Sequence, residues 1–160
     1  MFNEEEEYRP AANLPIFEKG KEIFEVVRNI CELFPEDNER LQHLKEELLT
    51  DAATLSVKVR GAETAELYDI KMEAAAIIRK AAKNLIIQNY ALEIHGFEHV
   101  DYYNIVRDLI EEYRLLFIDW VASFDKWNYI IDRWGLFNPP GVGPFDKYPD
   151  EDIPFNDFEE

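Results

Sequence analysis

The chain has 160 residues, enough for one domain built around a single hydrophobic core. Its 34 acidic and 17 basic residues give a net charge of −17, which disfavours nucleic acid and anionic membrane surfaces as partners. No stretch approaches the ~18 apolar residues of a membrane span, and the chain opens on an acidic run instead of an export signal. A single cysteine, Cys31, cannot form an internal disulfide. We therefore expect a soluble cytoplasmic protein.

Residues 1–12 hold four glutamates and show no apolar periodicity, which predicts a disordered acidic arm. A first helix is predicted from about Asn13, the expected N-cap, with Pro15 in the first turn. It should end at Phe34, because Pro35 pushes the preceding residue out of the helical region. Its apolar positions recur three and four apart, as in a bundle helix: Ile16, Gly20, Ile23, Val27, Ile30 and Phe34.

A second helix is predicted to begin at Asp37 or Asn38 and to end at Gly61 as a left-handed cap. Its apolar set is Leu41, Leu44, Leu48, Ala52, Leu55 and Val59. Thr64 is the expected N-cap of a third helix, which runs to about His95 and is stopped by Gly96. Its apolar set is Leu67, Ile70, Ala74, Ile77, Ala81 and Leu85, widened by Ile78, Ile86 and Ile87.

A fourth helix is predicted from about Glu98 to Trp134, followed by Gly135 as its stop, and a break around residues 123–125 is left open. Its stripe is Tyr102, Ile105, Leu109, Tyr113, Leu116, Trp120, Phe124, Trp127, Ile131 and Trp134. Proline and glycine then predict an extended or disordered acidic tail over residues 136–160. Short connections favour antiparallel neighbours, so residues 13–135 are predicted to form an all-α, up-down-up-down four-helix bundle.

Two segments resemble a known family. Residues 14–20, Leu-Pro-Ile-Phe-Glu-Lys-Gly, and residues 33–37, Leu-Phe-Pro-Glu-Asp, resemble the four-helix-bundle proteins encoded in intervening sequences of bacterial ribosomal RNA genes. Residues 49–61 are similar to that family's second helix, except that Thr50 and Asp51 stand where it has two basic residues. The resemblance covers about residues 14–120 and implies a ring-like homo-oligomer, frequently a pentamer. The C-terminal ending looks more like that of helical Bacteroidetes proteins without an assigned role.

No motif for catalysis or for a cofactor stands out. A di-iron bundle would need Glu-x-x-His, which is absent, and acid pairs three apart occur only as often as chance predicts. His95 and His99 have metal-ligand spacing, but Gly96 between them favours a loop or capping role. Cys31 has no basic neighbour in its sequence to activate it and is expected to be a buried, inert thiol. We expect no metal, no cofactor and no enzymatic activity.

Two groups of residues are candidate interaction sites. Trp120, Trp127 and Trp134 are seven apart and would form one stripe of the fourth helix, either in the core or against a partner or the chain's own tail. The second group is a basic cluster on the third helix, consisting of Lys71, Arg79, Lys80 and Lys83. It would pair with acids of its own molecule or bind an acidic partner, such as the C-terminal tail with Phe155 and Phe158 as anchors.

These features favour a non-catalytic interaction or assembly module, homo-oligomeric or bound to another protein. The leading alternative is an accessory protein linked to nucleic acid, associated with RNA or a reverse transcriptase. A divalent-metal hydrolase is a second alternative.

Overall fold

The computed structural model describes residues 14–148, which form four α-helices and a C-terminal segment without helix or strand. No β-strand occurs among these residues, and the all-α prediction is confirmed. The helices are α1 (Pro15–Cys31), α2 (Glu39–Thr64), α3 (Tyr68–Ile94) and α4 (Tyr103–Ala122), and a short 3₁₀ turn, η3 (Val100–Tyr102), precedes α4.

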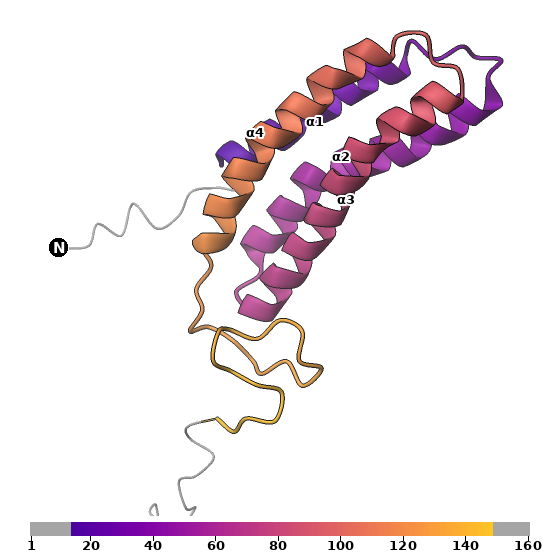
Figure 1. Cartoon of the computed structure of the whole chain (residues 1–160). Helices are drawn as coiled ribbons and strands as arrows, with labels where there is room; N and C mark the ends of the chain where they lie inside the picture. Colours follow the sequence, from indigo (N-terminus) through magenta and orange to yellow (C-terminus); the bar gives the residue numbers. More distant parts are fainter. Residues whose placement is uncertain (1–13, 149–160) are drawn as a thin grey trace, which may run out of the picture.

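The helices form a bundle in which each packs against its neighbours in the chain. Helix α2 contacts α1 and α3, and α4 contacts α3 and α1, which closes the ring. Figure 1 shows the four helices side by side, with successive helices running in opposite directions. The up-down-up-down four-helix bundle predicted from the short connections is confirmed.

Several helix ends follow from single residues. Pro15 is the first residue of α1, where its missing N–H has no partner to lose, and Leu14 is the N-cap. Asn13, the predicted cap, lies outside the described residues. Asn38 caps α2 as predicted, since its side-chain oxygen accepts the Leu41 N–H at 3.1 Å. Gly96, the predicted stop of α3, follows the helix with φ +82°, which is a left-handed conformation.

Several predicted boundaries are wrong. Helix α1 ends at Cys31 and not at Phe34, and α4 begins at Tyr103 and not at about Glu98. The junction of α2 and α3 is also displaced. Helix α2 continues through Gly61 to Thr64, so Gly61 does not end it and Thr64 does not cap α3. Gly61 does not take a positive φ, and the Thr64 hydroxyl donates to the Gly61 carbonyl at 2.8 Å within the last turn. The connection to Tyr68, the first residue of α3, is therefore residues 65–67, which lie later in the chain than predicted.

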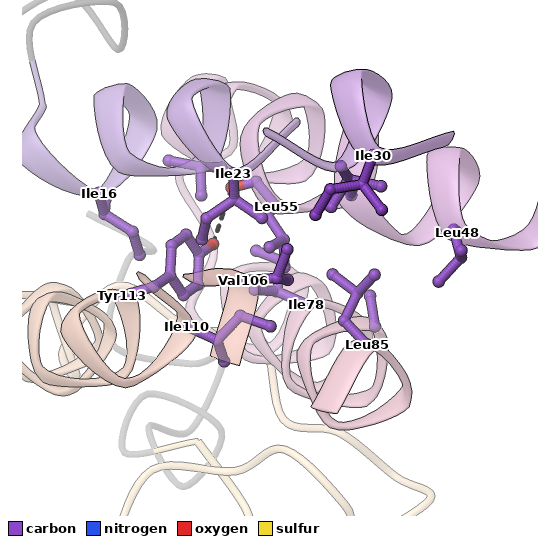
Figure 2. Close-up of a cluster of buried hydrophobic side chains, with 14 of the residues drawn as sticks. Ile16, Ile23, Ile30, Leu48, Leu55, Ile78, Leu85, Val106, Ile110 and Tyr113 are labelled. Carbon is purple, nitrogen blue, oxygen red and sulfur yellow. Dashed lines mark hydrogen bonds between the residues drawn. The ribbon is translucent and has the colours of Figure 1, made fainter. Parts of the chain in front are cut away.

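The core is built from residues seven apart on each helix. Figure 2 shows Ile16, Ile23 and Ile30 of α1 facing residues of the other three helices. The remaining labelled side chains are Leu48 and Leu55 of α2, Ile78 and Leu85 of α3, and Val106, Ile110 and Tyr113 of α4; all are buried. A seven-residue repeat keeps the same face inward along a gently supercoiled bundle helix.

The predicted stripes of α1 and α2 are buried at every position, whereas those of α3 and α4 are partly wrong. Ile70 and Ile77 of α3 are 46% and 41% exposed, while their neighbour Ile78 is fully buried. Tyr102 of η3 and Ile105 of α4 are likewise about half exposed, and the buried residues there are Tyr103, Val106 and Ile110. On both helices the buried residues lie one position after the predicted ones. The spacing could not separate the two sets, because apolar residues occupy both.

Helix α4 ends at Ala122, and the prediction that it reaches Trp134 is wrong. A break occurs after Ala122, but the chain does not resume a helix, because it pairs with the α2–α3 connection instead. The Tyr68 N–H donates to the Asn128 carbonyl at 2.9 Å, and the Asn128 side chain donates to the Glu66 carbonyl at 3.0 Å. These bonds fix the chain across the end of the bundle.

Candidate interaction surfaces

Residues 123–148, which we call the C-terminal loop, fold back on themselves beyond the end of α4 (Figure 1). The Ile131 N–H donates to the Tyr148 hydroxyl, which ties the last described residue to the start of the loop. The Arg133 guanidinium donates to the carbonyls of Pro144 and Asp146. The side chain of Ile131 is buried. The loop is therefore a folded appendage at the end of the bundle where α3 begins and α4 ends.

Asp132 organises the turn at residues 132–137 of this loop. Its carboxylate accepts the backbone N–H groups of Trp134, Leu136 and Phe137 at 3.0, 2.9 and 2.8 Å. The bond from Phe137, followed by those from Leu136 and Trp134, lowers the pKa of Asp132, because each stabilises the ionised carboxylate. The sequence signal for this turn, an aspartate three residues before Gly135, was masked by the helical periodicity assigned to the segment.

The loop exposes large apolar side chains. Trp134 and Phe145 are 92% and 93% exposed, and Leu136 is 75% exposed. The two segments that carry them lie side by side, since a Cβ on Gly135 would stand 3.3 Å from Pro144. We call Trp134, Leu136 and Phe145 the loop apolar patch. A contact with another molecule would remove these apolar side chains from water.

The three tryptophans do not form one stripe, and that prediction is wrong. Trp120 is buried and its Nε1–H donates to Glu63 at 2.7 Å, so it packs in the bundle. Trp127 is 90% exposed and follows the break, with its N–H donated to Asp125. Trp134 belongs to the loop apolar patch. Because α4 stops at Ala122, the seven-residue spacing has no helical meaning beyond Trp120.

A groove of about 380 Å³ runs between α3 and α4, and we call it the α3–α4 groove. Its floor is mostly apolar, and its lining side chains are Ile78, Ala82 and Ile86 of α3 and Ile110, Tyr113, Phe117 and Ile118 of α4. Three basic side chains, those of Arg79, Lys83 and Arg114, border it together with the carboxylate of Glu111. A groove with apolar walls and cations at its edge suits an amphipathic, acidic segment.

The structure divides the predicted basic cluster among three environments. Arg79 and Lys83 stand together at the α3–α4 groove. The Lys71 ammonium lies 5.3 Å from the ring centroid of Phe124. Lys80 faces α2: burial raises the pKa of Asp51 there, and the charge of Lys80 is among the influences that oppose the rise. None of the four forms an ion pair with another residue of the range 14–148.

Phe155 and Phe158, the predicted tail anchors, lie outside the described residues. The contact of the tail with α3 therefore stays a prediction.

The cysteine and the two histidines considered as candidate reactive residues are all engaged in packing or lie at helix ends. Cys31 is buried, and its burial raises the pKa of the thiol to about 11, so the thiol is uncharged at neutral pH. His95 follows the last residue of α3, and its carbonyl accepts a hydrogen bond from Asn38. The ring of His99 stacks on Tyr102. Within residues 14–148, no group of three or more metal-ligating side chains converges on one point.

In the described part of the chain, no helix has the length and apolar character needed to cross a bilayer. Comparison with protein-family models, with curated proteins and with solved structures finds no match to this chain. The resemblance to the bundle proteins of ribosomal RNA intervening sequences therefore stays a prediction.

Proposed function

We propose that this protein is a non-catalytic, cytoplasmic assembly module that forms homo-oligomers through the loop apolar patch. The observation that carries the proposal is the near-complete exposure of Trp134 and Phe145 on a loop fixed by its own hydrogen bonds. Burying a large apolar side chain contributes about 1.5–3 kcal/mol, and a prearranged loop loses little conformational entropy when it binds. Tryptophan is also among the residue types that dominate interface energies.

The test is the molar mass of the full chain in solution, measured by light scattering over a range of concentrations. We expect a species heavier than the 18.9 kDa monomer for the natural sequence. The variant Trp134→Ser/Phe145→Ser should dissociate at much higher concentration, because each truncated anchor weakens association by about 2 kcal/mol, or roughly thirtyfold. Its helical circular dichroism should stay unchanged.

The matched control is Val57→Ser/Leu115→Ser, which removes two apolar side chains that are 64% and 57% exposed on α2 and α4. This variant should keep the mass of the natural protein. A natural chain that is monomeric at every concentration would refute the assembly proposal, and dissociation of the control alone would place the contact on the helices.

The alternative of a nucleic-acid-linked accessory protein has one supporting observation, the unpaired Arg79 and Lys83 at the α3–α4 groove. An electrophoretic mobility shift with RNA and DNA at physiological salt separates it from the assembly module. Tight binding there, lost in Arg79→Glu/Lys83→Glu, would favour the accessory role.

A further inference from the structure

The border of the α3–α4 groove is positive on a strongly negative protein. Arg79, Lys83 and Arg114 against Glu111 leave a net of two positive charges there, while the chain as a whole carries −17. Arg114 is bound to Glu111, whereas Arg79 and Lys83 are exposed and form no ion pair within residues 14–148. A carboxylate-bearing segment would supply the missing partners.

The floor of the groove calls for apolar anchors as well as charge. Ile78, Ile110 and Tyr113, which line the groove, are buried; Figure 2 labels them. Ile118 at its side is half exposed, and Ile86 and Phe117 are only partly buried. The fitting occupant is thus an acidic peptide with apolar side chains a few residues apart.

The last twelve residues of the chain have this composition. Residues 149–160 contain six carboxylate side chains, no basic side chain, and the apolar residues Ile153, Phe155 and Phe158. They follow Tyr148, which the C-terminal loop holds at the bundle end where α3 begins. The far end of the groove, at Ile86, is 18 residues along α3 from Tyr68, or about 27 Å. Twelve extended residues reach about 40 Å, so the chain is long enough.

We propose that residues 149–160 bind in the α3–α4 groove of their own molecule, with Phe155 and Phe158 on its apolar floor and the flanking carboxylates against Arg79 and Lys83. The dimensions agree with this pairing. Three extended residues span about 10 Å, and the groove from Ile78 to Ile86 runs about 12 Å along α3. A cavity of about 150 Å³ accommodates one benzene ring, so the 380 Å³ of the groove suffice for two.

Attachment to the same chain favours this segment over competing occupants. A short tether gives the segment an effective concentration of about a millimolar at its groove, above that of a second copy in dilute solution. The acidic N-terminal arm is a poorer fit, because it contains Arg9 and precedes α1, which packs on α2 and α4. Docking would close the groove to other anionic partners, including nucleic acid.

The experiment places a nitroxide on the full-length protein at Asn156→Cys and records amide signals by nuclear magnetic resonance. Natural Cys31 is buried and its thiol has a pKa of about 11, so it should not react with the thiol-directed nitroxide reagent. The control is the unsubstituted chain treated with the same reagent. We expect the amides of Ala82, Ile86, Phe117 and Ile118 to lose most of their intensity. Amides around Val57, on the outer face of α2, should keep theirs.

Charge reversal tests the recognition. Arg79→Glu/Lys83→Glu in the spin-labelled chain should restore the groove signals, whereas Lys58→Glu/Arg60→Glu, an equal charge change on exposed residues of α2, should not. Unchanged groove intensities in the Asn156→Cys chain would overturn the proposal, and so would an equal effect of both reversals.

Two further samples identify the occupant. The first sample mixes Asn156→Cys protein that carries the nitroxide but no ¹⁵N with natural protein that carries ¹⁵N but no nitroxide. Broadening of the groove amides in this mixture would mean docking on a second copy and would overturn the intramolecular assignment. Broadening by a label at Asn3→Cys, with none from Asn156→Cys, would assign the groove to the N-terminal arm. These signals do not depend on molar mass, so docking and self-assembly can fail separately.

Discussion

At the scale of single residues, Gly20 sets how closely α1 approaches α2. A Cβ at this position would lie 2.6 Å from the Leu55 carbonyl oxygen, which is main chain and cannot rotate away. The same oxygen accepts the Tyr113 hydroxyl of α4 at 2.7 Å, the bond drawn in Figure 2. Three helices therefore meet at one carbonyl group, and the absence of a side chain on Gly20 is what allows the contact.

Gly20→Ala should lower the free energy of unfolding by about 1–3 kcal/mol, because the cost of overpacking exceeds the helix propensity that alanine gains. Urea denaturation followed by circular dichroism measures the change. Gly61→Ala is the matched control: nothing lies within 4 Å of its added Cβ, so the same substitution should raise the free energy by up to about 1 kcal/mol. A destabilised Gly61→Ala, or a stabilised Gly20→Ala, would contradict this account.

At the scale of elements, sequence periodicity predicted the buried faces of α1 and α2 correctly but not those of α3 and α4. On α1 and α2 the predicted stripe has few apolar rivals, so spacing decides the buried face. On α3, Ile70, Ile77 and Ile87 lie outside the buried repeat of Ile78 and Leu85, so a local pattern cannot select among them. Which of these residues are buried depends on how the neighbouring helices pack against α3. The spacing of residues within one helix carries no information about that packing.

The candidate surfaces were predictable only in part. Arg79 and Lys83 were predicted as neighbours from their spacing of four residues, but the groove beside them depends on the packing of α3 against α4. The loop apolar patch was missed because residues 123–134 continue the apolar spacing of α4. Their irregular path follows from the pairing of Asn128 with Glu66 and Tyr68, partners about sixty residues away.

The C-terminal loop depends on Asp132 for its turn at residues 132–137, so Asp132→Ala should loosen the loop without disturbing the helices. Three N–H groups lose their acceptor, and the amides of Trp134, Leu136 and Phe137 should exchange with solvent faster at neutral pH. Asp119→Ala, an equal change of charge on exposed α4, should leave these amides unchanged.

The pH dependence of the loop has a definite sign. The pKa of Asp132 is lowered in the folded chain, so its stabilising contribution is complete above the ordinary aspartate value of 3.8 and is lost as the pH falls through the lower, folded value. If the loop amides of the natural protein exchanged with solvent as fast at neutral pH as those of Asp132→Ala, the carboxylate would not hold the turn.

At the scale of the whole molecule, the net charge of −17 acts against the compact state. The ion pairs that lysine and arginine form among residues 14–148 all involve exposed or partly exposed side chains, and such pairs contribute little. Glu46 and Glu47 of α2 illustrate the imbalance, because they lie together with Asp51 along one polar depression of the surface. Repulsion among like charges should therefore outweigh attraction in the bundle.

Added sodium chloride should accordingly stabilise the protein, because salt shortens the range of this repulsion from about 30 Å at 0.01 M to less than 10 Å above 0.1 M. An increase of about 1 kcal/mol in the free energy of unfolding corresponds to a rise of roughly 2–4 °C in Tm. Urea is the suitable denaturant since it is uncharged, and one protein concentration must be kept because self-association would also shift the midpoint.

Glu46→Gln/Glu47→Gln should be more stable than the natural chain at low salt and gain less from added salt. If salt instead lowered the stability of both proteins, attractive pairs would dominate the surface, and the repulsion assigned to the −17 charge would be wrong.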